Sequence, residues 1–186
     1  MAERPQQLTG LRRIGPEDAA ILSGFLEGLP EGDRTFFKED IDAPAIERWC
    51  QDERAARWML VGDDGSSQAF LAIIPGVAWS AHVGELRLSV GAQHRRRGIG
   101  RRLAQLAVTE GVRMGLRKLM VEVVADKEGD LAMFTAIGFE AEALLKDHIR
   151  DRAGNLRDLV ILSHDVDTVG RSMGAGGLDL AVERGG

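Results

Sequence analysis

The stretch QHRRRGIGRRLAQLAV, residues 93–108, decides the fold of this chain, because it joins an arginine-crowded glycine turn to an amphipathic helix. Between residues 99 and 116, polar side chains recur every three or four positions and apolar side chains occupy the other face, as in a helix that packs on a sheet. The polar stripe consists of Arg102, Gln105, Thr109 and Arg113. The pattern therefore predicts a helix here.

The start of this helix carries an unexpected charge. A helix N-terminus has free N–H groups and a partial positive charge, so Arg101 and Arg102 in the first turn are each unfavourable by about 0.3–1 kcal/mol. The conflict disappears if an anion binds there. Gly98 and Gly100 allow φ > 0 and a close approach of main-chain N–H groups to phosphate oxygens. The sequence therefore predicts a local phosphate site in a chain of net charge −5.

Two common phosphate-binding loops do not match this turn. A P-loop requires G-x-x-x-x-G-K-[ST], and no such lysine follows the glycines. A dinucleotide-binding turn requires G-x-G-x-x-G directly after a strand, whereas here Leu103 takes the place of the third glycine and residues 92–97 intervene.

Hydrophobic periodicity around this helix predicts the remaining elements. Strands are expected at residues 58–62, 68–76 and 83–90, as an antiparallel meander, and at 118–125, 140–150 and 155–163. Helices are expected at residues 15–29, 44–53 and 131–137. One further strand is expected ahead of the first helix. The order is therefore strand, two helices, three strands, helix, strand, helix and two strands, which predicts an α+β fold with one mixed, mostly antiparallel central sheet flanked by helices. We expect one domain over residues 1–165 and a glycine-rich, flexible tail over residues 166–186.

Composition excludes several classes of protein. The 186 residues are 44% hydrophobic and 28% charged, as in ordinary globular domains. The acidic balance argues against a general nucleic-acid binder. Cys50 is the chain's single cysteine, so no internal disulfide can form, and the histidines lack metal-ligand spacing. No signal-like or membrane-spanning stretch is evident, so we expect a cytoplasmic protein with no membrane partner and no metal.

The pattern R-x-x-G-x-G at residues 95–100, preceded by the strand ELRLSV, resembles motif A of the GNAT superfamily of N-acetyltransferases. The strand KLMVEVVA, the element LAMFTAIGF and the closing hairpin also resemble that family, in element order over residues 8–164. Single-domain bacterial protein-lysine acetyltransferases have a similar general layout. The resemblance implies a GNAT-like fold, acetyl-CoA as cosubstrate and an amine as acceptor.

The resemblance also implies site residues. Glu85 corresponds to the glutamate that some family members use as a catalytic base. The expected cofactor-binding residues belong to the end of the strand, the glycine turn and the short helix: Leu88, Ser89, Val90, Arg95, Arg96, Arg97, Gly98, Ile99, Gly100, Arg101 and Phe134. The acceptor pocket is expected to be formed mostly by residues 31–49 and the last hairpin.

Two positions depart from the family's pattern. Phe134 stands where many relatives have a tyrosine that acts as general acid, and the chain contains no tyrosine. Water can protonate the departing thiolate, because an ordinary thiol has a pKa of about 8.5. Lys127 replaces an asparagine that contacts the cofactor in relatives. His148 is an alternative base, and Cys50 is expected to be a core residue.

Three functions remain open on the sequence alone. The first is an N-acetyltransferase that moves acetyl from acetyl-CoA to a small-molecule amine, a protein lysine or an N-terminus, by direct attack in a ternary complex. The second is a non-catalytic acyl-CoA-binding sensor, which the missing tyrosine favours. The third is a nucleic-acid-binding module built on the arginine cluster, which the acidic chain disfavours. Exposed edge strands would allow a homodimer.

Overall fold

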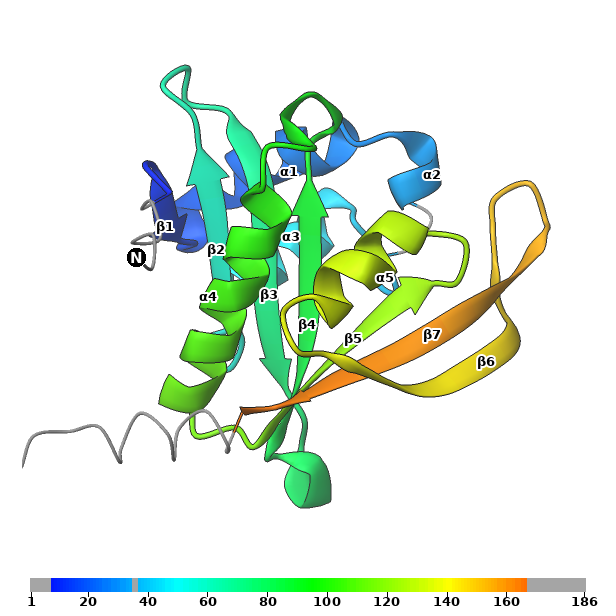
Figure 1. The fold of residues 1–186 in the computed structure, drawn as a ribbon. Coiled ribbons are helices and arrows are strands. Elements are labelled where there is room, and N and C mark those ends of the chain that lie inside the picture. The colour runs from blue at the N-terminus through cyan, green and yellow to red at the C-terminus, as the bar shows by residue number, and fades with distance from the viewer. Residues whose placement is uncertain (1–7, 35–36, 167–186) are drawn as a thin grey trace, which may run out of the picture.

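The computed structural model describes residues 8–34 and 37–166. One open, twisted sheet runs through the molecule in the order β1-β2-β3-β4-β5-β7-β6 (Figure 1). The strands are β1 (Leu11–Arg13), β2 (Ala56–Val61), β3 (Ser67–Pro75), β4 (Val83–Val90), β5 (Lys118–Val124), β6 (Glu140–Arg150) and β7 (Leu156–Asp165). The helices are α1 (Ala19–Glu27), α2 (Glu31–Arg34), α3 (Ala43–Gln51), α4 (Ile99–Arg113) and α5 (Glu128–Thr135).

The sheet is antiparallel except between β4 and β5. These two strands are parallel and are paired over three residues only, from Val83 with Lys118 to Glu85 with Met120. Beyond that point β4 continues beside β3 and β5 continues beside β7, so the sheet divides into two arms (Figure 1). The predicted α+β fold with a mixed, mostly antiparallel sheet is confirmed.

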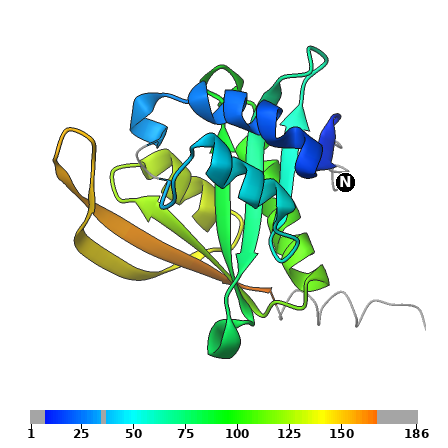
Figure 2. The same cartoon turned by 180° about the vertical axis from the view of Figure 1, so that it is seen from behind.

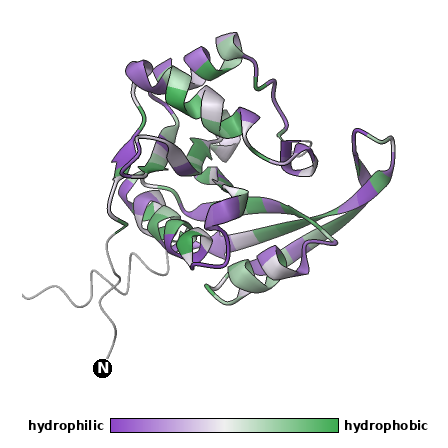
Figure 3. Cartoon of the chain, turned by 90° about the horizontal axis from the view of Figure 1, so that it is seen from above, coloured by the Kyte–Doolittle hydropathy of each residue, from purple (hydrophilic) through white to green (hydrophobic). Residues whose placement is uncertain are grey.

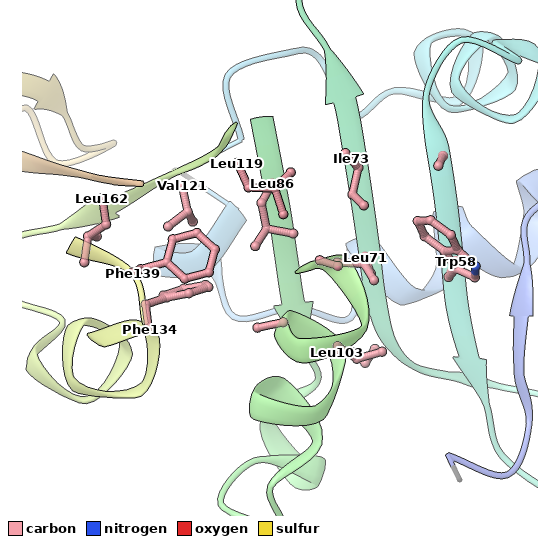
Figure 4. Packing of buried hydrophobic residues seen from close by; sticks show 14 of the residues in the cluster. Trp58, Leu71, Ile73, Leu86, Leu103, Leu119, Val121, Phe134, Phe139 and Leu162 are labelled. Atoms are coloured by element: carbon pink, nitrogen blue, oxygen red, sulfur yellow. The ribbon is translucent and has the colours of Figure 1, made fainter. Parts of the chain in front are cut away.

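Helices cover both faces of the sheet and produce two cores. Helices α4 and α5 lie on one face, whereas α1 and α3 lie on the other (Figures 1 and 2). The first core joins side chains of β3, β4 and β5 to α4 and to the end of α5, with Leu71, Leu86, Leu103 and Phe139 among its buried members (Figure 4). The second core lies beneath α1 and α3. Hydrophobic and hydrophilic residues are mixed along the outer helices (Figure 3), as expected for elements with one face toward a core.

The sequence-based elements match the structure closely, with a few differences. The helix expected at 15–29 is divided into a short 3-10 turn, Pro16–Asp18, and α1. Helix α2 was not predicted, because four residues are too few to show a period. The short helix expected at 131–137 begins earlier, with Glu128, and ends at Thr135.

The end of the chain differs from the expected domain boundary at one residue. Val166 is fully buried, and its N–H donates to the Arg117 carbonyl, so it belongs to the folded domain rather than to a tail. Residues 167–186 lie outside the described residues, and the flexible tail therefore stays a prediction. Among the helices that the structure describes, none is long and apolar enough to cross a membrane.

Candidate active site

The division of the sheet opens a large cavity of about 1520 Å³. Its walls come from β4, β5, the start of α4, α5, the segment after α1 and the hairpin of β6 and β7. The strands that form its floor are joined at Glu85 and Met120 and separate beyond them. Every sequence-predicted site residue except Arg97 lines this cavity. Residues from segments far apart in the chain therefore meet at one opening.

The main chain of β4 faces this opening at alternate residues. Gly76 N–H donates to the Val83 carbonyl and Gly91 N–H donates to the Gln68 carbonyl, so the odd-numbered residues of β4 bond toward β3. By the alternation of a strand, Leu86, Leu88 and Val90 direct their N–H and C=O groups toward β5. The Leu86 N–H still takes part in the last pairing with β5, that of Glu85 with Met120, and beyond it β5 has moved away.

This alternation refines the expected set of cofactor contacts. The sequence assigned Leu88, Ser89 and Val90, whereas the main-chain groups of Ser89 lie on the β3 side. Leu86 was missed because its availability depends on where β4 and β5 separate. The pairing of Glu85 with Met120 already uses the Leu86 N–H, and the Val90 carbonyl accepts a hydrogen bond from Arg95 Nε at 3.0 Å. The Leu86 carbonyl, both main-chain groups of Leu88 and the Val90 N–H are left as the open positions.

The glycine turn adopts the geometry of an anion site. Gly98 is the N-cap of α4 with φ +74°, and no side chain caps the helix. The N–H groups of the first turn are therefore available to a ligand. Arg96 also has a positive φ of 59°, a strained conformation for a residue with a side chain.

Gly100 is needed for a different reason than expected. Its φ is not positive, because it lies inside the first turn of α4. A Cβ at this position would lie 3.3 Å from Met133 Sδ and 3.7 Å from Val90 Cγ2. Gly100 therefore permits the close approach of α4, α5 and β4 beside the cavity. Only Gly98 has the positive φ that was expected at both glycines.

The arginines of the turn do not act as one group. Arg96 and Arg101 line the cavity, whereas Arg97 is exposed and does not. Arg95 forms an ion pair with Asp33, on the segment that follows α1. Arg102 turns back and donates from its guanidinium to the Arg97 carbonyl at 3.0 Å, which stabilises the turn itself.

Glu85 lies where the two arms separate, and its side chain is 22% exposed. Arg87 Nε donates to Glu85 Oε1 at 3.0 Å, and Lys38 Nζ lies 3.2 Å from the same oxygen. Burial alone would raise the pKa of the Glu85 carboxyl, but the hydrogen bond from Arg87 and the positive charges of Arg87 and Lys38 outweigh burial and lower that pKa. Glu85 is therefore ionised at neutral pH and able to accept a proton.

Lys38 and Glu122 also belong to this site. Lys38 lies in the segment 31–49 that was expected to form the acceptor pocket but was not singled out, and Glu122 was not expected from the sequence. Lys38 Nζ donates to Glu122 Oε1 at 2.6 Å, and both residues line the cavity. Glu122 could have been noticed as the lone acidic residue inside the apolar strand KLMVEVVA. Lys38 carries no such signal, because only the fold brings it next to β4 and β5.

Phe134 supports the wall of the cavity. Its ring is 4% exposed and meets Phe139 edge-on, with ring centroids 5.2 Å apart. Gly138 has φ +94° and donates to the Thr135 carbonyl, while Phe139 N–H donates to the Phe134 carbonyl. This is the Schellman ending of a helix, in which Gly138 takes the left-handed position after the last turn.

The remaining candidates are placed differently. His148 on β6 is exposed and lines the cavity on the hairpin side, so it remains within the site. Lys127 also lines the cavity, and its Nζ lies 3.6 Å from Asp33 Oδ1. Cys50 is buried in the core beneath α1 and α3, and burial raises the pKa of its thiol. Across residues 8–34 and 37–166, no group of three or more His, Cys, Asp or Glu side chains is arranged to hold a metal ion.

The site and the fold define the class of protein. The sequence model of the Acetyltransferase (GNAT) family matches residues 25–139. Since this match spans more than half of the chain, the protein belongs to the GNAT family of acetyltransferases, whose members transfer acetyl from acetyl-CoA. A comparison with the curated proteins found no match.

Solved structures show the same fold at low identity. The acetyltransferase of the GNAT family from Streptococcus pneumoniae is 19% identical, with a TM-score of 0.73 over 83% of this chain and 98% of that chain. The yncA protein from Salmonella typhimurium, solved with its cofactor acetyl-CoA, is 14% identical, with a TM-score of 0.71 over 84% and 93%. A mutant of the spermidine N-acetyltransferase SpeG from Vibrio cholerae is 15% identical, with a TM-score of 0.71 over 87% and 98%.

Proposed function

We propose that this protein is an N-acetyltransferase that moves an acetyl group from acetyl-CoA to a primary amine by direct attack in a ternary complex. The observation that carries the proposal is the position of Glu85 at the point where β4 and β5 separate, in the same cavity as the uncapped start of α4. An ionised carboxylate, a strand with open main-chain groups and a helix N-terminus thus line one cavity.

The residues present fit the cosubstrate. Gly98, Ile99, Gly100 and Arg101 would bind its diphosphate through main-chain N–H groups, with the Arg96 and Arg101 guanidinium groups adding positive charge. The Leu86 carbonyl and the main-chain groups of Leu88 would hold the pantetheine arm, as an added strand does. Acetyl-CoA supplies the acetyl group as an activated thioester. A main-chain N–H beside its carbonyl would polarise that carbonyl.

Glu85 is proposed to prepare the acceptor. An amine must be neutral to attack, and for a free lysine at pH 7 the protonated state represents a handicap of about 4.6 kcal/mol. Glu85 is ionised and partly shielded from solvent, so it can take the proton directly or through one water. The handicap for an α-amine is only about 1 kcal/mol, so the need for Glu85 is greatest with lysine-like acceptors.

The thiolate leaves without a phenolic acid. Phe134 occupies the wall where such an acid would stand, and its ring offers no proton. A thiol with an ordinary pKa of about 8.5 gives a stable enough thiolate for solvent to protonate it. The cavity is wide and open to solvent on the hairpin side, where His148 is exposed.

The carboxylates where β4 and β5 separate support a cationic acceptor. Glu85 and Glu122 line the cavity there, and both already contact an ammonium group, that of Lys38. Carboxylates attract ammonium groups, so small polyamines and lysine side chains fit this lining better than anionic acceptors. The name of the SpeG structure shows that the fold serves a spermidine N-acetyltransferase, which makes polyamines a first choice for a screen.

Release of free thiol from acetyl-CoA, measured against a panel of polyamines, amino acids and lysine or N-terminal peptides, tests the proposal. An amine-dependent release is expected. If coenzyme A binds and no amine releases thiol, the proposal is wrong and a binding or sensing role is favoured. Tight, steeply salt-dependent binding of nucleic acid would instead favour the arginine-cluster alternative. Cytoplasmic location and homodimer formation stay predictions.

A further inference from the structure

Lys38 occupies the place that an acceptor amine would need. Its Nζ lies 3.2 Å from Glu85 Oε1 and 2.6 Å from Glu122 Oε1, and so bridges β4 and β5 at the mouth of their separation (strands labelled in Figure 1). Glu85 and Glu122 lie on one face of the sheet, because Glu85 pairs with Met120 and Glu122 is two residues further along β5. A primary amine of the chain itself thus contacts the carboxylate that the proposed function assigns as the base.

We propose that Lys38 is an acetylation site of this protein, modified by the acetyl-CoA bound to the same chain. The proposal rests on the proposed function, because it uses the same cavity and the same base. Acetylation of Lys38 is a separate event, because transfer of acetyl to an external acceptor does not require this residue to be modified.

The geometry allows Lys38 to move the short distance that attack requires. Its side chain is 41% exposed, and ion pairs between partly exposed groups are weak and easily exchanged. The lysine side chain has four flexible carbons, so Nζ can turn from Glu122 toward the open edge of β4 without moving the backbone. Val121 and Leu88 line the cavity directly behind this opening, so the path leads into the cavity rather than away from it.

The chemistry balances with the groups present. The Lys38 ammonium gives one proton to the Glu85 carboxylate, and the neutral Nζ forms a bond to the acetyl carbonyl carbon. The carbon–sulfur bond breaks, and its electron pair leaves with sulfur, which takes a proton from water. Glu85 and the nitrogen each give one proton back to water. The products are an acetamide at Lys38 and the free thiol of coenzyme A, with Glu85 again ionised.

Other lysines of the chain are placed differently and provide internal controls. Lys118 pairs with Glu142, on the outer strand β6. Lys127 lines the cavity at the start of α5, where its Nζ lies 3.6 Å from Asp33 Oδ1. Lys146 lies exposed on β6 and does not line the cavity. Acetylation by chance in solution would favour Lys146, whereas acetylation in the site favours Lys38.

Mass spectrometry of the intact protein and of its peptides after incubation with acetyl-CoA tests the proposal. Lys38 is expected to gain an acetyl group at least about 10-fold faster than Lys146, because a bound donor raises the effective concentration at Lys38. The rate constant is expected to be the same when the protein is diluted, since donor and acceptor lie in one chain. Lys38→Arg should remove this modification, whereas Lys146→Arg should leave it.

A second measurement needs no turnover. Acetic anhydride labels free amines, and desulfo-coenzyme A, which has no thiol to become acetylated, should lower the labelling of Lys38 at least about 3-fold while Lys146 is unchanged, if Lys38 lies over the bound cosubstrate. Equal acetylation of Lys38 and Lys146, a rate that falls with dilution, or unchanged labelling would each overturn the proposal. If external amines release thiol while Lys38 stays unmodified, this inference fails and the proposed function stands. If no amine releases thiol either, the proposed function fails as well.

Discussion

Glu85 of β4 and Met120 of β5 are the last residue pair that joins these two strands. Beyond this pair the main chain of β4 is no longer paired with β5. The cavity begins there. The candidate base is therefore fixed at the joint of the two arms, where the backbone is held on both sides. A rigid position for a reacting group is what proton transfer over a short distance requires.

Binding of coenzyme A should depend on Gly100. Saturating coenzyme A at about 100 times its Kd should stabilise the protein by about 2.7 kcal/mol and raise its melting temperature. Gly100→Glu should abolish this rise, because a Cβ there already lies 3.3 Å from Met133 Sδ and the added carboxylate would repel the diphosphate. Thermal unfolding with and without coenzyme A measures both effects.

Gly24→Glu is the matched control for that experiment. Gly24 is exposed on α1, does not line the cavity, and has open space around a Cβ. The Gly24→Glu substitution adds the same charge to a helix away from the site, so coenzyme A should still raise the melting temperature of this variant. Loss of the rise in both variants would show that charge alone, rather than the position of Gly100, controls binding.

Removal of the Glu85 carboxylate should slow the transfer without weakening cofactor binding. Glu85→Gln should lower kcat by about 10²- to 10⁴-fold with a lysine-like acceptor. The pKa of Glu85 is lowered, so the carboxylate is already ionised throughout the neutral range. The rise of kcat/KM with pH should therefore follow deprotonation of the acceptor amine, and the variant should show a parallel profile at a lower level.

Steady-state kinetics across the neutral and mildly alkaline range measure this profile. Glu140→Gln, at an exposed position on β6, is the control and should keep its activity. Turnover of Glu85→Gln equal to that of the wild type would exclude Glu85 as base. His148→Gln would then be the next variant, because His148 lines the same cavity.

Asp18 should make stability depend on pH. It is 1% exposed, and it accepts hydrogen bonds from the Arg12 guanidinium and from Gly15 N–H, the latter at 2.8 Å. The hydrogen bond from Arg12 outweighs burial and lowers the pKa of Asp18 from its ordinary value of 3.8. The stabilisation is therefore complete above that value and is lost as the pH falls through the lower pKa of the folded state.

Asp18→Asn should lower the free energy of unfolding by about 1–3 kcal/mol at neutral pH, because buried donors lose their charged acceptor. Denaturant unfolding at a series of pH values measures the difference from the wild type, which should shrink below the ordinary pKa. Asp63→Asn, at an exposed turn, should change little. A difference that stays constant down to strongly acidic pH would contradict the assignment.

Gly138 should tolerate alanine less well than Gly154. Both have positive φ, of 94° and 89°, so alanine at either site is strained by about 1–2 kcal/mol. At Gly138 a Cβ would also lie 3.1 Å from His164 Nε2, whose ring is held by Phe139, whereas at Gly154 the space is open. Thermal or denaturant unfolding of the two variants compares them, and equal losses would show that the His164 ring can move aside.

Local patterns were sufficient to predict most of the fold. The alternation in ELRLSV and KLMVEVVA, the stripe of α4 and the Gly-Phe ending of α5 each depend on neighbours a few residues away, and each is found in the structure. The glycine turn was located for the same reason, since a helix that starts with glycines and arginines conflicts with its own dipole. The sequence did not show that the 3-10 turn Pro16–Asp18 is separate from α1, because the helical pattern continues across Asp18.

The amino-acid sequence by itself determined most of the elements, because these follow from spacing along the chain. It also predicts an anion site at the start of α4, and its resemblance to the GNAT family implies Glu85 as a candidate base. Only the tertiary structure decided where β4 and β5 separate, and therefore that the Leu86 carbonyl is open and that Ser89 bonds toward β3. It also decided that Lys38 and Glu122 meet Glu85. Contacts between residues so far apart in the chain depend on sheet register and on helix packing across the sheet, and no local period records them.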